Sequence, residues 1–180
     1  MHEPLPDPAA ALTESFGPFG RRLMAVCRVA AILGGLVFMA LVAMSIVSIT
    51  GRKLWSAPVP GDFEVLQMCS AFAASTFFAY CHLNHGDVKV DFFTAHWRAG
   101  RVHWLDAVGC GLLGLFGLLI AWRTAVGALS LREAGETSVI LGWPLWVAQA
   151  LMVPGFLLMG AAGLYMAGRH IAHARGQTHR

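Results

Sequence analysis

Three ionisable residues lie in or beside long apolar segments of the chain: Glu64, Asp106 and Arg123. An ionisable side chain inside a membrane span usually binds a solute, moves a proton or contacts another group. Asp106 and Arg123 are 17 residues apart, or about 25 Å along a helix, so they cannot pair within one helix. We therefore expect Arg123 to snorkel to the membrane surface or to contact another subunit, with a direct transport role as the alternative.

Histidine and cysteine side chains would supply the ligands of a haem or a metal ion. Of the 8 histidines, only His82 approaches the interior of an apolar segment, whereas a haem in a helical bundle needs axial histidines inside the spans. The 4 cysteines show no Cys-x-x-Cys spacing and are interpreted as small buried residues. The chain is therefore expected to hold no metal or other cofactor of its own and not to be an enzyme.

The composition is that of a membrane protein. Of the 180 residues, 57% are hydrophobic and only 13% are charged, and the mean hydropathy is +0.61; soluble domains carry about 25% charged residues. The segments without any charged residue are Val29–Gly51, Val65–Gly86, Ala107–Trp122 and Thr137–Gly168. The net charge of +3 is small and scattered, so no nucleic-acid partner is expected.

The predicted fold class is an all-α integral membrane protein with four transmembrane helices, because about 20 apolar residues are needed to cross a bilayer. The spans are expected at about residues 26–50, 63–83, 104–129 and 144–167. Together they form a membrane domain over residues 21–170, preceded by a disordered tail at 1–20 and followed by a short tail at 171–180.

The distribution of lysine and arginine predicts the orientation. The two tails and the loop between the second and third spans carry 9 of these 13 residues, so this side should face the cytoplasm. The tryptophans fall near the predicted membrane surfaces, where amphipathic rings settle. They are Trp55, Trp104, Trp122, Trp143 and Trp146, and Trp97 lies in the cytoplasmic loop.

The cytoplasmic loop Val88–Trp104 is predicted to contain a short amphipathic helix that lies in the headgroup region and contacts membrane lipids. Its apolar residues fall close to one helical face, and its basic residues are largely directed elsewhere. An ordinary loop rich in aromatic residues is the alternative. The candidate anchor residues are Asp87, Lys89, Asp91, Phe93, Trp97, Arg98 and Trp104.

Small residues recur along three of the spans, as they do where transmembrane helices pack closely. They are Ala71, Ser75 and Ala79, then Gly111, Gly114 and Gly117, and finally Gly160, Gly163 and Ala167. The polar residues of the second span could instead line a pore. The residues thus favour an accessory or scaffold subunit. The alternatives are a stand-alone four-span homo-oligomeric channel, a structural membrane protein and a membrane anchor for a redox enzyme.

Several motifs follow one another around the spans, over roughly residues 20–170. They are Arg52 after the first span, Pro60-Gly61-Asp62-Phe63-Glu64 at the start of the second, Ala79-Tyr80-Cys81-His82-Leu83-Asn84-His85-Gly86-Asp87-Val88-Lys89-Val90-Asp91 at its end, and Glu136-Thr137-Ser138, Trp143-Pro144-Leu145-Trp146 and Val153-Pro154-Gly155 around the fourth. In this order, the chain resembles the small membrane (Q-type) subunit of tripartite ATP-independent periplasmic (TRAP) transporters. Asp87 departs from the family pattern, which often has histidine there, whereas Asp91 matches it.

The resemblance implies a small permease subunit in the bacterial inner (cytoplasmic) membrane. Its partners would be a large TRAP permease subunit and a periplasmic solute-binding protein, which together import carboxylate-bearing organic solutes driven by a sodium gradient. The large subunit would hold sodium and substrate and move like an elevator, while the small one acts as a fixed scaffold. On this interpretation the candidate subunit or docking contacts are Arg52, Lys53, Glu64 and Arg123. Helix capping is the alternative role for Glu64 and Asp91.

Overall fold

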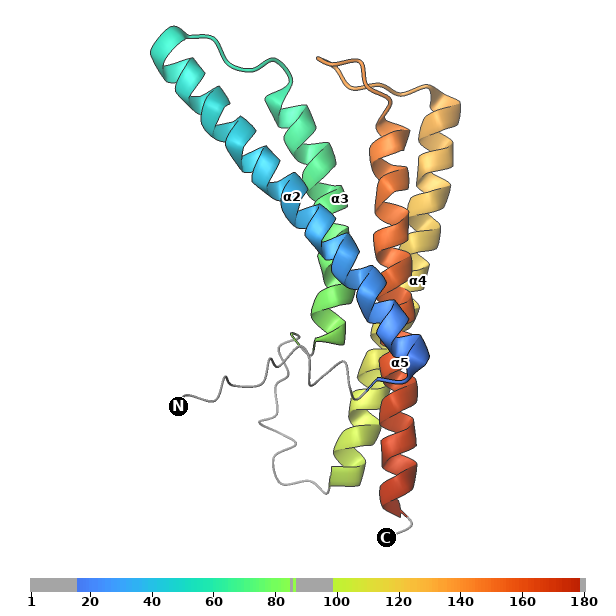
Figure 1. Cartoon of the computed structure of the whole chain (residues 1–180). Helices are drawn as coiled ribbons and strands as arrows, with labels where there is room; N and C mark the ends of the chain where they lie inside the picture. Colours follow the sequence, from blue (N-terminus) through green and yellow to red (C-terminus); the bar gives the residue numbers. More distant parts are fainter. Residues whose placement is uncertain (1–15, 85, 87–98, 179–180) are drawn as a thin grey trace, which may run out of the picture.

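The structure is a computed structural model that describes residues 16–84, 86 and 99–178. In these residues it contains four helices and no strand: α2 (Pro18–Trp55), α3 (Asp62–Leu83), α4 (Ala99–Ala134) and α5 (Leu145–Thr178) (Figure 1). The all-α prediction is therefore confirmed for the described part of the chain. Three of the helices, α2, α4 and α5, are long and apolar enough to cross a membrane.

Helix α3 is not one of these three candidates. Its 22 residues are long enough, but Gln67, Ser75 and His82 are among the polar residues that lower its hydropathy. Three of the four predicted spans are thus supported by length and hydropathy, and the span over 63–83 stays a prediction, because an absence of charge does not make a segment strongly apolar.

The three long helices extend well beyond the charge-free segments from which the spans were predicted. Helix α2 has 38 residues, or about 57 Å, and runs from Pro18 past Arg28 to Arg52 and Lys53. Arginine and lysine are good helix formers, so a charge ends an apolar run without ending the helix. Helix α2 ends at Trp55 and is capped by Ser56, which has a φ of 53° and donates its backbone N–H to the carbonyl oxygen of Gly51.

The predicted interfacial helix lies mostly outside the described residues. This applies to six of the seven candidate anchors: Asp87, Lys89, Asp91, Phe93, Trp97 and Arg98. The seventh, Trp104, lies inside α4 and is about half exposed, so the end of the predicted loop belongs to the same continuous helix as the third span.

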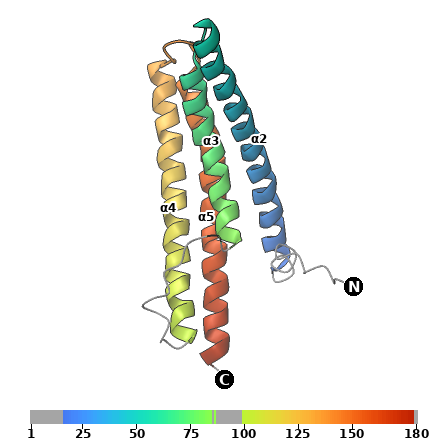
Figure 2. The same cartoon turned by 90° about the vertical axis from the view of Figure 1, so that its left-hand side faces the viewer.

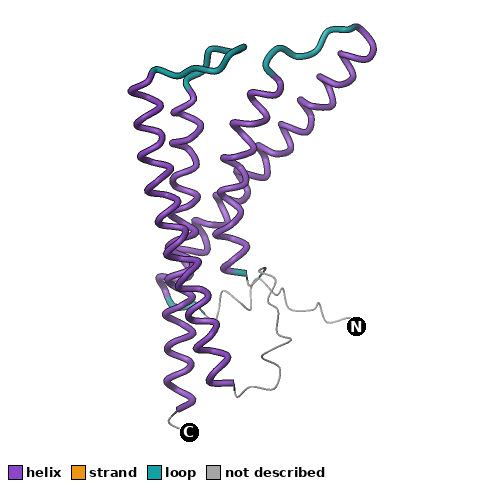
Figure 3. The backbone as a smooth tube through the Cα atoms, turned by 180° about the vertical axis from the view of Figure 1, so that it is seen from behind, coloured by secondary structure: helices purple, strands orange, loops and turns teal. Residues whose placement is uncertain are grey.

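The helices lie side by side in the order α2, α3, α5, α4. Helix α3 packs against α2 and α5, and among the described helices α4 packs only against α5. Figure 2 shows α2 and α4 on opposite sides of the other two helices. The two short loops, 56–61 and 135–144, lie at the same end of the bundle, and the two helix pairs spread apart toward that end (Figures 1 and 3).

Close glycine contacts hold α4 against α5. A Cβ atom at Gly114 would lie 2.8 Å from the backbone nitrogen of Leu164, and one at Gly117 would lie 2.8 Å from that of Gly160. One at Gly163 would lie 2.6 Å from the Cα atom of Gly114. The interpretation of these small residues as a packing face is confirmed, because only glycine lets the two backbones approach so closely.

Helix α3 meets its two neighbours in the same way. Gly155 of α5 lies against Ser75, and Gly34 of α2 lies against Thr76, in each case with no space for a Cβ atom. The hydroxyl groups of Ser75 and Thr76 donate hydrogen bonds to carbonyl oxygens three residues earlier, each at 2.7 Å. The polar groups of this face are therefore satisfied within α3 and do not disturb the packing.

The largest buried cluster lies at the end of the bundle away from the two short loops. It joins the start of α2 to the end of α3 and to the second half of α5, and it includes Cys27, Leu83 and Met166. Phe16 is buried there, 5.8 Å from the ring of Tyr165 and beneath the guanidinium of Arg169. Helix α2 begins at Pro18, inside the tail that the sequence predicted over 1–20, and Phe16 before it packs on α5 because its aromatic side chain finds a site there.

Elsewhere the large apolar side chains face outward and the small ones face inward. Ala73, Ala79, Ala121 and Ala162 are buried between helices, whereas most leucine, isoleucine and valine side chains of α2 and α4 are exposed. This is the reverse of a soluble protein and fits a bundle whose surroundings are hydrocarbon or other membrane helices.

Candidate functional site

The first turn of α3 joins α3 to the two segments beside it at the end of the bundle where loops 56–61 and 135–144 lie. Gly61 precedes this turn with a φ of 73°, a conformation that favours glycine. A Cβ atom at Gly61 would also lie 2.6 Å from the side chain of Leu141 in loop 135–144. The helix then opens with two acidic residues, Asp62 and Glu64, and each is bonded to a different part of the chain.

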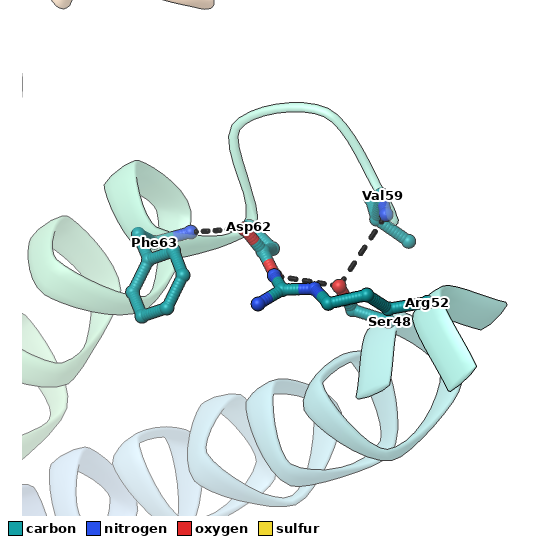
Figure 4. A network of polar contacts seen from close by, with 5 residues as sticks. All are labelled: Ser48, Arg52, Val59, Asp62 and Phe63. Carbon is teal, nitrogen blue, oxygen red and sulfur yellow. Dashed lines mark hydrogen bonds and ion pairs between the residues drawn. The ribbon is translucent and has the colours of Figure 1, made fainter. Parts of the chain in front are cut away.

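Asp62 fastens α3 to the end of α2 (Figure 4). Its Oδ2 atom accepts a hydrogen bond from the Ser48 hydroxyl at 2.5 Å and lies 3.5 Å from a terminal nitrogen of Arg52. Its Oδ1 atom accepts a bond from the backbone N–H of Phe63 at 2.9 Å. Ser48 in turn accepts a bond from the backbone N–H of Val59 at 3.3 Å, so the loop between the helices belongs to the same network.

Arg52 is the partly exposed member of this network. It forms the ion pair with Asp62 and lies 5.8 Å from the centre of the Phe63 ring. An exposed ion pair of this kind contributes little by itself, so the buried Ser48 hydroxyl is the more important partner of Asp62. Its neighbour Lys53 is exposed.

The network lowers the pKa of Asp62. The hydrogen bond from Ser48 is the main cause, and the Phe63 N–H and the Arg52 charge act in the same direction. These bonds favour the carboxylate, so they stabilise the loop above the ordinary aspartate pKa of about 3.9. That stabilisation is lost as the pH falls through the lowered pKa of the folded protein.

We expect loop 56–61 to open at acidic pH, together with the Ser48–Asp62 contact. Hydrogen exchange of the Val59 and Phe63 amides, compared at each pH with an Asp62→Asn variant, measures this. The wild-type protein should be better protected than the variant at neutral pH, and the two should converge below about pH 4. A difference that stays constant with pH would contradict the assignment.

Glu64 fastens α3 to the loop between α4 and α5. Its Oε1 atom accepts a hydrogen bond from the backbone N–H of Ile140 at 2.8 Å, and its Oε2 atom accepts one from Leu141 at 3.0 Å. One carboxylate thus binds two successive amides of a segment 76 residues further along the chain. Charge-assisted bonds of this kind are stronger than bonds between neutral groups.

Loop 135–144 has a defined shape of its own. The N–H of Ser138 donates to the carbonyl oxygen of Trp143 at 2.8 Å, and the N–H of Trp143 donates to the Ser138 hydroxyl at 3.2 Å. Gly142 allows the chain to turn, with a φ of 66°. Because the amides at its tip point to Glu64, Val139 and Ile140 project outward, 96% and 64% exposed.

The sequence-predicted contacts are therefore only partly brought together. Arg52 and Glu64 lie at the same end of the bundle, and both are engaged within the chain. Arg123 lies apart from them, exposed on α4. Asp62 and Ser48 were missed as a pair: a single serine in an apolar run gives no signal, and their contact depends on how α2 and α3 meet.

Two cavities lie between the helices on this half of the molecule. The first, of about 390 Å³, is lined almost entirely by apolar side chains of α2, α3 and the start of α5, including Val37, Phe72 and Leu151. The second, of about 530 Å³, is more polar and includes Glu64, Gln67 and Gln149. Among the described residues, no group of three or more His, Cys, Asp or Glu side chains could hold a metal ion.

Comparison with known proteins identifies the family. No curated protein and no solved structure matches the chain. A family model described as "Tripartite ATP-independent periplasmic transporters, DctQ component" matches residues 41–173, which include the end of α2, all of α3 and α4 and most of α5. Members of this family work with a large permease and a solute-binding protein. The chain belongs to the DctQ family, the small permease component of TRAP transporters.

Proposed function

We propose that this chain is a fixed scaffold for the large permease subunit in sodium-driven uptake of carboxylate-bearing organic solutes. The large subunit carries the sodium and substrate sites, and the small chain braces it in the bacterial inner membrane. Both termini face the cytoplasm, which places loops 56–61 and 135–144 on the periplasmic side.

The observation that carries this proposal is that close contacts and hydrogen bonds join neighbouring helices both along the bundle and at its loop-bearing end. Backbone contacts between glycines join α4 to α5, and the carboxylates of Asp62 and Glu64 join α3 to α2 and to loop 135–144. A subunit that stays static while its partner subunit moves requires such contacts between its helices more than it requires a solute-binding site. The broad apolar surface is suited to contact with another membrane protein.

Helix α3 is the fourth span in this proposal. It lies beside two helices that are apolar enough to cross a membrane, and its 22 residues extend about 33 Å, close to the thickness of a bilayer core. Its polar side chains are tolerated because Ser75 and Thr76 face α5 and α2 and not lipid.

Loop 135–144 is a docking element for the solute-binding protein in this proposal. The two bonds to Glu64 fix its conformation before binding, which reduces the entropy lost on association. Val139 and Ile140 then offer exposed apolar side chains. Glu64 and Arg52 act by positioning the loops, while Lys53 is free to make a direct contact with a partner.

Purification of the complex tests the proposal. We would tag the C-terminus of the chain, extract native membranes in mild detergent and identify the proteins that co-purify. We expect a large multi-span permease at about one copy per chain. Recovery of the chain alone, or only with copies of itself, would overturn the scaffold function and favour a homo-oligomeric channel or a structural protein.

A further inference from the structure

Arg123 is a cation on an otherwise apolar surface of α4. Trp122 beside it is 68% exposed, and Leu119 and Val126, one turn away on either side, are 50% and 39% exposed. Arg123 is itself exposed, and within the described part of the chain it forms no hydrogen bond or ion pair. Since α4 packs only against α5 among the described helices, this surface is available to a neighbour.

The packing of α4 against α5 gives the depth of Arg123 in the bundle. Gly117 lies against Gly160, about 9 Å from Arg123 along α4. Gly127 lies against Gln149, about 6 Å away on the other side. The helices are antiparallel, so these two contacts place Arg123 level with Val153 and Pro154 of α5.

The packing of α5 against α3 then relates that level to the ends of the bundle. Gly155 lies against Ser75, so Arg123 is level with the middle of α3. This level is about 18 Å from Asp62 and about 13 Å from Leu83 along α3, and about 14 Å from Leu145 along α5. In a bilayer core of about 30 Å, Arg123 therefore lies near the centre.

At this depth Trp122 would lie within the bilayer core, whereas the sequence predicts it near a membrane surface, and snorkelling alone would not bring the guanidinium of Arg123 to water. An extended arginine side chain reaches roughly 7 Å, about half of the distance to either surface. None of the five acidic side chains of the described residues is available to Arg123 at this level. Asp106 is about 25 Å away along α4, Glu133 is about 15 Å away, and Glu136 lies beyond the end of α4. Asp62 and Glu64 are bonded at the first turn of α3.

We propose that Arg123 pairs within the membrane with a carboxylate on a transmembrane helix of the large permease subunit. This inference rests on the proposed function and adds the contact that fixes the two subunits in register. An unpaired charge in hydrocarbon is unfavourable, so an opposite charge is required at the same depth. The adjacent exposed tryptophan fits an interface, because tryptophan and arginine are the residue types most enriched at interaction hot spots.

The charge and depth of Arg123 also argue against a second copy of the chain or a lipid as the neighbour of this surface. A second copy of the chain packed through the same surface would bring two Arg123 side chains together, and like charges repel. A lipid phosphate lies at the membrane surface, beyond the reach of the side chain at this depth. A carboxylate on a partner helix meets both requirements, since it is anionic and can be placed at the centre of the bilayer.

The test uses the tagged complex and three variants. Arg123→Leu should reduce the permease recovered per chain about tenfold or more, because the partner carboxylate is left unpaired. Arg123→Lys keeps the charge and should retain most of the association. Arg22→Leu removes the same charge outside the apolar segment and is the matched control. Leucine eases membrane insertion, so the amount of Arg123→Leu chain in the membrane should not fall.

The outcomes separate this inference from the proposed function. If the wild-type chain recovers no permease, the proposed function fails, and with it the partner named here. If the wild-type chain and Arg123→Leu recover equal amounts, the function stands and the pairing is wrong. A photo-cross-linking residue at Val126 should join the chain to a permease helix that carries an acidic residue; products with lipid or a second copy alone would overturn the pairing.

Discussion

Replacing Gly163 with alanine is expected to weaken the packing of α4 against α5 and to destabilise the bundle by about 1–3 kcal/mol. The new Cβ atom would lie 2.6 Å from the Cα and nitrogen atoms of Gly114 and 2.9 Å from the carbonyl oxygen of Cys110. All of these are backbone atoms, which cannot rotate away, so the two helices must move apart. Thermal unfolding of the purified protein in detergent, followed by circular dichroism, measures the loss.

The same substitution at Gly168 is the control. Gly168 lies on the same helix, five residues later, and a Cβ atom there would meet no other atom within 4 Å. Alanine should stabilise α5 at this position by up to about 1 kcal/mol, because it is the better helix former. The two variants are therefore expected to shift the melting temperature in opposite directions, and equal shifts would show that α4 and α5 do not pack as described.

Replacing Glu64 with glutamine is expected to release loop 135–144 from α3. Glutamine has nearly the same shape but presents an NH₂ group to one of the two amides that now donate to a carboxylate oxygen. We expect the amide hydrogens of Ile140 and Leu141 to exchange about tenfold faster or more, while the amides in the middle of α5 keep their protection. Hydrogen exchange measured by mass spectrometry on the peptides that cover the loop follows this change.

Glu133→Gln provides the comparison for that experiment. Glu133 is exposed in the last turn of α4, close in sequence to the same loop. Its substitution changes the net charge equally and should leave the loop protected. Faster exchange in both variants would mean that the charge of this end, and not the two hydrogen bonds of Glu64, holds the loop.

The sequence was most informative where one residue type decides the outcome. The charge-free segments located the spans of α2, α4 and α5, because burial of a charge in a bilayer is so unfavourable. The glycines of α4 and α5 identified the face that packs, since no other residue allows two backbones to approach so closely. Helix ends were less predictable, because α2 continues through Arg52 and Lys53 once it has left the apolar segment.

The contacts between distant segments could not be read from the sequence. Glu64 was identified as a residue of interest, but its partners, Ile140 and Leu141, are backbone amides, which every residue has, so nothing in the sequence marks them. The depth of Arg123 was also hidden. The sequence predicted that the third span continues past Arg123 to about residue 129, but only the contacts of Gly117 with Gly160 and of Gly127 with Gln149 show which level of α5 lies beside Arg123.

A row of helices, unlike a ring, has two edges. Helices α2 and α4 form these edges: α4 packs only against α5 among the described helices, and α2 packs mainly against α3 and meets α5 only near its start. The edge formed by α2 carries no charge between Arg28 and Arg52, whereas the edge formed by α4 carries Arg123 between Asp106 and Arg132. The two edges thus differ in chemistry, so on the proposed pairing a neighbour that bears a carboxylate joins the row at the edge formed by α4.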